Sequence, residues 1–228
     1  MSTSTNTMTP EKRVSKLFEL LEISGKKEHV SGNMTQLDHA LRVANLAKVE
    51  GADEDTILAA LMLDTRGITV TIPSYPNMAV GDRVELYWNG YAGNTSDAVD
   101  DDEVDVIFVR KLGFSNKTSE LVESNVLAKR YLGSMPPEGL GSIIPKNIGI
   151  TQPKDLVAGV RVTIPMWGGP LSPTEMREFE KDPLFKKKVQ LAVWDVAAAK
   201  TTGDKPPALD TYRDMAIRNL LMSMVALY

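Results

Sequence analysis

The chain has no cysteine and only two histidines among its 228 residues. Without cysteine there are no disulfides, no thiolate metal ligands and no cysteine nucleophile, a pattern typical of a cytoplasmic protein. Two histidines also leave little material for a Ser-His-Asp nucleophile set, and no such set can be assembled from the motifs. We therefore assign no catalytic residue from the sequence.

Long apolar runs and excess positive charge are missing as well. No apolar run approaches the ~20 residues that a membrane-spanning helix needs, and the polar residues 1–8 do not have the pattern of a signal peptide. The 26 Lys and Arg are outnumbered by 30 Asp and Glu. Because nucleic-acid binding needs a basic surface, the chain is predicted to be a cytoplasmic protein with neither a nucleic-acid nor a membrane partner.

Helix-start signals occur at several places in the chain. Thr9 precedes a proline, and Thr35 is followed three residues later by Asp38, as in a capping box. Asp53 precedes a short apolar helix, and residues 172–175 (Ser-Pro-Thr-Glu) form a second capping box. Helical periodicity also covers 116–132 and the C-terminal part of the chain. The closing apolar residues are predicted to be core, with a dimer contact as the alternative: Leu220, Leu221, Met222, Met224 and Val225.

From Gly67 the apolar period changes from about 3.6 to 2, which indicates strands. Alternating runs occupy 68–72, 84–88 and 104–109, and a later one occupies Val160–Ile164. We expect a small antiparallel β-element to which the last run adds a strand. The acidic segment 97–105 lacks the ligand pattern of a calcium loop and is predicted to be a solvated loop tip.

Four segments, taken in order, resemble one family. They are Gln36–Leu41 with Ala59–Asp64, Ala128–Leu132 (Ala-Lys-Arg-Tyr-Leu), Gly168–Pro173, and Trp194-Asp195 followed by Pro206-Pro207 and Tyr212. Together they resemble the HD-domain mixed-valent diiron oxygenases that cleave organophosphonates, the PhnZ/TmpB type. The resemblance covers about half of the chain and implies an HD-like helical bundle.

In that family, four His and two Asp hold two irons, since imidazole and carboxylate suit iron and leave positions open for substrate and oxygen. The resemblance implies that His39 matches the first ligand, Asp64 the bridging aspartate and Asp195 the last aspartate. It also implies that Lys129 contacts a substrate phosphonate or phosphate, whereas the residue pattern alone is equally compatible with a solvated helix lysine.

The ligand set departs from the family at several positions. Leu63 stands where the histidine of the His-Asp pair belongs, and Asn125 stands where a histidine precedes the Ala-Lys-Arg-Tyr-Leu run. No histidine follows His39. A full diiron site is therefore not expected. His39, Asp64 and Asp195 are left as ligands for one divalent metal (iron, manganese or zinc), or as a relic in which His39 bonds to Asp64.

The predicted fold is mainly α, an HD-domain-like helical bundle with a small inserted antiparallel β-element, and thus α+β overall. The predicted divisions are HD-like helices over 9–66, a β-rich insertion over 67–111, an HD-like helix over 112–140, a second insertion over 141–167 and HD-like C-terminal helices over 168–228. Whether the β segments are a natural insertion or a graft is left open by the sequence.

Two functions follow from these observations. The incomplete ligand set favours a degenerate, catalytically silent scaffold or binding protein. The alternative is a metal-dependent oxygenase or phosphohydrolase that acts on an organophosphonate or phosphoester with a reduced metal site. The silent protein would bind a partner through its pocket or its β-element. A small phosphonate- or phosphate-like ligand and a homo-oligomer are further predictions.

Overall fold

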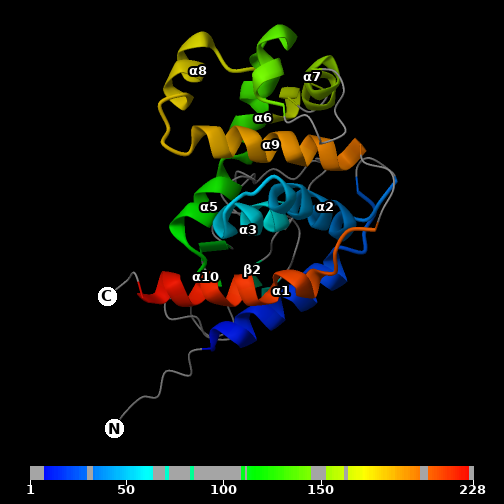
Figure 1. The fold of residues 1–228 in the computed structure, drawn as a ribbon, viewed down its shortest axis with the longest axis vertical. Coiled ribbons are helices and arrows are strands. Elements are labelled where there is room, and N and C mark those ends of the chain that lie inside the picture. The colour runs from blue at the N-terminus through cyan, green and yellow to red at the C-terminus, as the bar shows by residue number, and fades with distance from the viewer. Residues whose placement is uncertain are drawn as a thin grey trace.

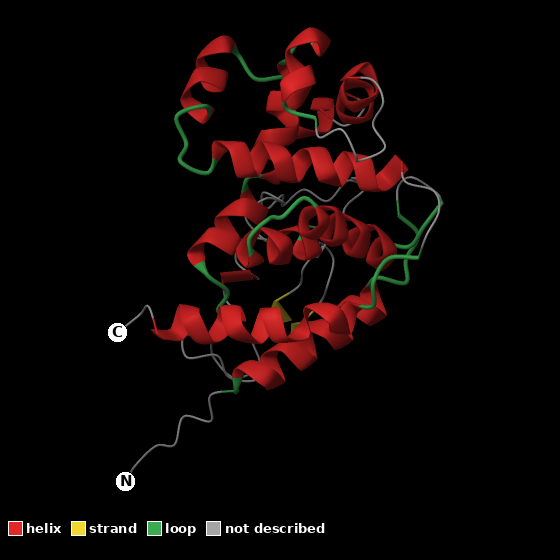
Figure 2. Ribbon diagram, in the orientation of Figure 1, coloured by secondary structure: helices red, strands yellow, loops and turns green. Residues whose placement is uncertain are grey.

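The protein is mainly helical in the computed structural model (Figures 1 and 2). The structure describes residues 8–29, 33–63, 70–71, 83–84, 109–110, 112–144, 153–161, 164–200 and 205–225. The α-helices are α1 (Pro10–Ser24), α2 (Gln36–Val49), α3 (Glu54–Met62), α5 (Asn116–Glu123), α6 (Asn125–Ser134), α7 (Pro153–Arg161), α8 (Pro173–Phe179), α9 (Phe185–Lys200) and α10 (Arg213–Val225). Within these described ranges, three 3₁₀ helices join them: η1 (Pro137–Ser142), η2 (Ile164–Trp167) and η3 (Leu209–Tyr212).

The helices begin where side-chain caps satisfy the first free amides. Thr9 accepts a hydrogen bond from the amide of Lys12, and Asp53 caps α3 by accepting one from Thr56. Before α8, Ser172 and Glu175 form both bonds of the capping box, as predicted. The cap side chains therefore fix the helix starts that the sequence indicated.

Helix α9 lies in the middle of the molecule, with α6 and α7 on one side and α2 and α3 on the other (Figure 1). Helices α1 and α10 pack together beyond α3. Five consecutive residues of α9, 191–195, are buried, so this helix has no solvent-facing side along that stretch. Because it is shared by two helical layers, α9 carries the centre of the apolar core.

The predicted strand at Val160–Ile164 is wrong. Helix α7 ends at Arg161, and η2 begins at Ile164. The apolar side chains of α7, Leu156, Val157 and Val160, are all buried and lie on one helical face. A short alternation of β-branched residues did not reveal this longer helical period.

Two short strands, β1 (Val70–Thr71) and β2 (Arg83–Val84), pair antiparallel, with Val70 opposite Val84. This pairing does not amount to the predicted β-element. Val109, at the end of the predicted third strand, is helical. Most of the predicted insertion lies outside the described residues, as do the acidic segment 97–105 and Trp88.

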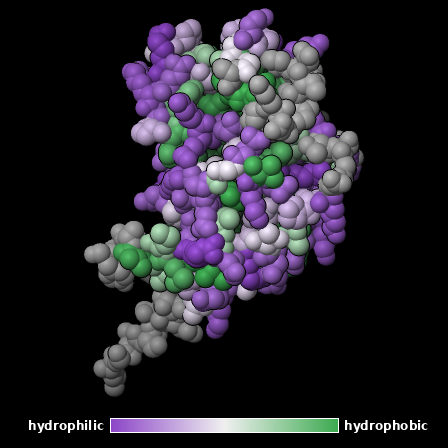
Figure 3. All heavy atoms as spheres, in the orientation of Figure 1, coloured by the Kyte–Doolittle hydropathy of each residue, from purple (hydrophilic) through white to green (hydrophobic). Residues whose placement is uncertain are grey.

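Two further helical predictions need correction. The helix predicted over 116–132 is two helices, α5 and α6, which meet at Ser124. Of the apolar residues predicted to be core near the C-terminus, Leu220 is buried. The apolar side chains that follow are exposed: Leu221, Met222, Met224 and Val225. They contribute to the hydrophobic surface near the C-terminus in Figure 3. No helix in the described ranges combines the length and apolarity of a membrane span.

A polar cluster joins the starts of α3 and α5 to α10. The carboxylate of Asp55 accepts hydrogen bonds from Ser115, from Thr118 and, at 2.8 Å, from the Asn219 amide. Lys117 adds an ion pair at 3.4 Å. Burial alone would raise the pKa of Asp55, but these hydrogen bonds outweigh burial and hold its pKa below the ordinary value.

Asp55→Asn is expected to lower the free energy of unfolding by about 2 kcal/mol at pH 7, since hydrogen bonds to a charged group are the strong ones. A pKa that is lower in the folded than in the unfolded chain stabilises the fold above about pH 4, the unfolded value. That contribution is lost as the pH falls through the folded value. Urea unfolding at pH 7 and at pH 3 measures the free energy of unfolding of both proteins. The difference between wild type and variant should be smaller at pH 3. An equal difference in the free energy of unfolding at both pH values would contradict the lowered pKa of Asp55.

Candidate functional site

His39 and Asp195 lie side by side in the interior, although 156 positions separate them. His39 stands in the first turn of α2 and Asp195 in the middle of α9, and their exposed fractions are 1% and 4%. Nε2 of His39 lies 3.1 Å from the Asp195 carbonyl oxygen and 3.3 Å from Oδ1 of its carboxylate. A carbonyl oxygen only accepts hydrogen bonds, so this geometry makes Nε2 the protonated nitrogen and a donor.

Helix α6 supplies two more groups to the same carboxylate. Nζ of Lys129 forms an ion pair with Oδ2 of Asp195, and Nδ2 of Asn125 donates to that oxygen at 3.2 Å. These two residues are four apart, so they lie on one face of α6. His39, Asn125, Lys129 and Asp195 together form the Asp195 cluster.

Lys129 is not a solvated helix residue, because its side chain is only 17% exposed. Its ammonium nitrogen also lies 5.3 Å from the centre of the Trp167 ring, which is within cation–π range. Asn125 is 3% exposed, and its Oδ1 has no hydrogen-bond partner among the described residues. The sequence marked Asn125 only as a lost ligand. The four-residue spacing between Asn125 and Lys129 was the sequence feature that could have predicted their shared contact with Asp195.

The second histidine borders the cluster. His29 stacks on His39 with ring centres 4.0 Å apart and planes 16° from parallel. The backbone amide of His29 donates a hydrogen bond to the carbonyl oxygen of Met34. This bond holds the segment before α2 against that helix. The two histidines of the protein thus meet at one place. Of the three predicted metal ligands, the structure brings His39 and Asp195 together, and Asp64 lies outside the described residues.

The arrangement of the Asp195 cluster does not fit a metal ion. Metal ligands must present lone pairs, whereas Nε2 of His39, Nζ of Lys129 and Nδ2 of Asn125 all present hydrogens to Asp195. In the described part of the chain no three His, Asp or Glu side chains are grouped as a metal site would require. A diiron centre of the family kind also fails on number, because the chain has two histidines and that centre needs four.

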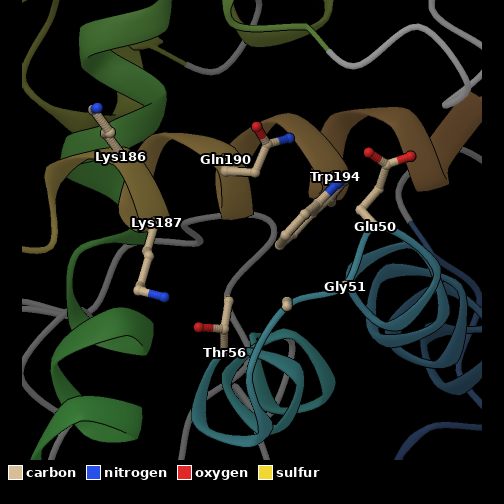
Figure 4. Close-up of a pocket in the computed structure, with 8 residues that line it drawn as sticks. Glu50, Gly51, Thr56, Lys186, Lys187, Gln190 and Trp194 are labelled. Carbon is tan, nitrogen blue, oxygen red and sulfur yellow. The ribbon is translucent and has the colours of Figure 1, made fainter.

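A pocket of about 280 Å³ opens elsewhere along α9 (Figure 4). Its lining residues are Glu50, Gly51, Ala52, Thr56, Lys186, Lys187, Gln190 and Trp194. Lys187 extends toward Thr56 and forms an ion pair with Asp53 at 2.5 Å. The N–H groups of Gln190 and Trp194 are buried and have no partner among the described residues, so the pocket does not expose them to a ligand. We therefore centre the candidate site on the Asp195 cluster.

Comparison with known proteins finds two phosphonate dioxygenases that are similar to the chain over most of its length. No family model matches the chain. Hydroxymethylphosphonate dioxygenase of Gimesia maris is 27% identical over 206 residues, which cover 90% of this chain and 86% of that enzyme. The glycine-betaine-forming 1-hydroxy-2-(trimethylamino)ethylphosphonate dioxygenase of Leisingera caerulea is 25% identical over 182 residues, covering 80% and 78%.

An uncharacterized protein of Acanthamoeba polyphaga mimivirus is 26% identical over 207 residues, which cover 91% of this chain and 81% of the viral protein. The chain is therefore similar to phosphonate dioxygenases over most of its length, and the similarity is not limited to the quoted motifs.

Proposed function

We propose that this protein recognises a small organophosphonate or a related phosphoester. The observation that carries the proposal is its similarity, over 80–90% of the chain, to two enzymes named for different phosphonate substrates. Those substrates differ in their carbon groups and share the phosphonate. We infer that this group is what the chain recognises, and that the chain descends from the HD-domain oxygenases.

Lys129 is the proposed contact for the anionic group. A phosphonate carries negative charge near neutral pH and pairs with an ammonium through charge-assisted hydrogen bonds. Lys129 keeps part of its side chain accessible, 17%, and the Trp167 ring lies beside it. Because Lys129 is largely buried, water screens its charge less, and the attraction between its ammonium and a phosphonate is stronger.

For the reaction, the dioxygenase relatives favour a metal-dependent oxygenase or phosphohydrolase with a reduced site at His39, Asp64 and Asp195. One imidazole and two carboxylates are ligand types that iron, manganese and zinc accept. The metal would supply Lewis-acid or oxygen chemistry. In the described arrangement, hydrogens on Lys129 and Asn125 occupy the Asp195 carboxylate, and Nε2 of His39 donates to the Asp195 carbonyl, so these groups are not free to bind a metal.

The second candidate is a catalytically silent protein that binds the same ligand without turning it over. A specific observation favours it: the Asp195 carboxylate is already bound by Lys129 and Asn125. The proposed domain ranges, a cytoplasmic location and a homo-oligomer are compatible with both candidates and stay predictions.

Calorimetric titration with methylphosphonate tests the proposed function. Wild type should bind it, and Lys129→Met should bind at least about tenfold more weakly, since a hydrogen bond to a charged group contributes about 1.5–3 kcal/mol. Lys12→Met, which changes an exposed lysine on α1, is the matched control and should bind like wild type. Absence of binding to methylphosphonate, hydroxymethylphosphonate and a simple phosphoester would refute the proposal.

Elemental analysis of the same preparations separates the two candidates. About one iron, manganese or zinc per chain, lost in both His39→Ala and Asp195→Asn, would support the enzyme. Phosphonate binding by wild type with no stoichiometric metal would support the silent protein.

A further inference from the structure

Lys129 and Trp167 lie side by side, and both keep part of their surface open to solvent. Nζ of Lys129 lies over the Trp167 ring, 5.3 Å from its centre, and forms its ion pair with Oδ2 of Asp195. The lysine side chain is 17% exposed, and Trp167 is half-buried. The indole ring therefore borders the accessible side of the ammonium, and an anion that reaches Lys129 approaches beside this ring.

The segment around Trp167 holds the residue in this position. Ile164, at the start of η2, packs against α6, and its carbonyl oxygen accepts a hydrogen bond from the amide of Gly169 at 3.0 Å. The carbonyl oxygen of Gly169 accepts a second hydrogen bond from Nε of Arg130 at 2.7 Å. Gly169 has φ of +82°, a left-handed conformation that glycine adopts without strain. The turn is thus tied to α6 on both sides of Trp167, which keeps the ring next to Lys129.

We propose that Trp167 is a specificity-determining residue, which selects phosphonates by the group attached to phosphorus through carbon and favours uncharged, apolar groups. This selectivity rests on the proposed function, which places the anionic group of the ligand at Lys129. It adds the chemical class of the carbon substituent and requires no metal.

The orientation of a bound phosphonate follows from the charges around Lys129. The phosphonate oxygens accept hydrogen bonds from the ammonium at about 2.7–2.9 Å, whereas the Asp195 carboxylate and the negative face of the indole ring repel them. An apolar carbon substituent is not repelled by the ring. It begins two bonds from the bound oxygen, so it can lie within about 4.0–4.5 Å of Trp167, the range of van der Waals contact.

The same arrangement disfavours a positively charged substituent. A free indole face attracts a cation, but the Lys129 ammonium already lies over this face. Lys129 would repel a second cation beside the ring, and its partial burial leaves little water to screen that repulsion. An apolar group meets no such repulsion, and its contact with the ring removes apolar surface from water. Two substituents of equal size are therefore distinguished by their charge.

The competing interpretation is that Trp167 only packs against Lys129 and supports its position. In that case, removing the ring changes the affinity for every phosphonate by the same factor. The two interpretations therefore differ in the ratio of affinities between ligands, which a general weakening of the Lys129 contact leaves unchanged.

Calorimetric titration of wild type with three phosphonates tests this selectivity. Methylphosphonate is the reference, propylphosphonate adds two methylenes, and 2-aminoethylphosphonate has an ammonium in place of the last methyl of the propyl group. Wild type should bind propylphosphonate about tenfold more tightly than methylphosphonate, as expected for two buried methylenes. It should also bind propylphosphonate at least about tenfold more tightly than 2-aminoethylphosphonate, because only the latter carries a second cation to Lys129.

Three variants identify Trp167 as the source of the selectivity. Trp167→Ser and the larger Trp167→Gln both remove the aromatic ring, so a measurement remains possible if one of them does not fold. Either variant should bring the ratio of propylphosphonate to methylphosphonate affinity close to one. Trp167→Phe keeps an aromatic face and should preserve the wild-type ratio.

Three results would overturn the proposed role of Trp167. They are equal binding of propylphosphonate and methylphosphonate by wild type, binding of 2-aminoethylphosphonate as tight as that of propylphosphonate, and a wild-type ratio in a folded variant that lacks the ring. In each of them methylphosphonate still binds, so the proposed function stands. If none of the three phosphonates binds to wild type, the proposed function fails, and the role of Trp167 fails with it.

Discussion

Asp195→Ala is expected to lower the free energy of unfolding by about 3–5 kcal/mol, the cost of removing one partner from a buried ion pair. The substitution leaves the Lys129 ammonium and the amide of the nearly buried Asn125 without their acceptor. His39 loses its contact with Oδ1 but keeps the Asp195 backbone carbonyl at 3.1 Å, which alanine also provides. Most of the cost therefore comes from donors on α6. Urea unfolding at neutral pH measures it.

A double substitution identifies the source of this cost. Lys129→Met in the Asp195→Ala background removes the unpaired ammonium, so part of the lost stability should return. The two substitutions should therefore be strongly non-additive, as expected for residues in direct contact. Additive losses would show that the two side chains are not coupled and would contradict the described ion pair.

Tyr212→Ala is expected to cost a similar amount, about 3–5 kcal/mol, because it empties the space of a large aromatic ring in the core. Tyr212 ends η3 and is fully buried. Its hydroxyl has no hydrogen-bond partner among the described residues, and burial raises its pKa to about 12. The ring thus stabilises the fold through packing, and the hydroxyl adds a desolvation cost.

Tyr212→Phe is the control for this explanation. It keeps the ring and removes the unpaired hydroxyl, so stability should stay the same or increase by about 1 kcal/mol. Thermal unfolding of the two variants beside wild type provides the comparison. A large loss in the Phe variant would show that the hydroxyl has a hydrogen-bond partner and would refute the packing explanation.

Local signals in the sequence predicted the helical framework well. Thr9, Asp53 and Ser172 cap helices because each has a short polar side chain that reaches an amide within three residues. Gly51 follows the end of α2 with φ of +77°, a left-handed conformation that glycine adopts without strain. These features depend on neighbours in the chain, and for that reason the sequence alone reveals them.

The strand prediction at Val160–Ile164 failed because contacts distant in sequence, and not local signals, determine the structure there. Its residues alternate like a strand, but Val160 packs close to Gly133 of α6, as does Ile164. A side-chain carbon on Gly133 would lie 1.9 Å from Cδ1 of Ile164. This close approach of η2 to α6 is a tertiary contact, and such contacts override local strand propensity.

The candidate site could be predicted only in part. The family resemblance pointed to His39, Lys129 and Asp195, but it assigned Lys129 to a ligand and Asp195 to a metal. Their ion pair joins residues 66 positions apart on α6 and α9, and no local pattern encodes such a pairing. Which groups neutralise a buried carboxylate depends on the packing of whole helices, and this is what the structure adds.

The central position of α9 constrains how the chain reaches its native state during synthesis. Helices α2 and α6 both pack against α9, which begins only at Phe185, and α1 packs against α10 near the end of the chain. Helices α2 and α3 pack on each other, as do α6 and α7, but the sides of α2 and α6 that face α9 have no partner until α9 has been made. Such long sequence separations slow folding and leave apolar surface open to aggregation. The part of the core around α9 therefore closes only after α9 has been made, later than the contacts that the preceding helices make with each other.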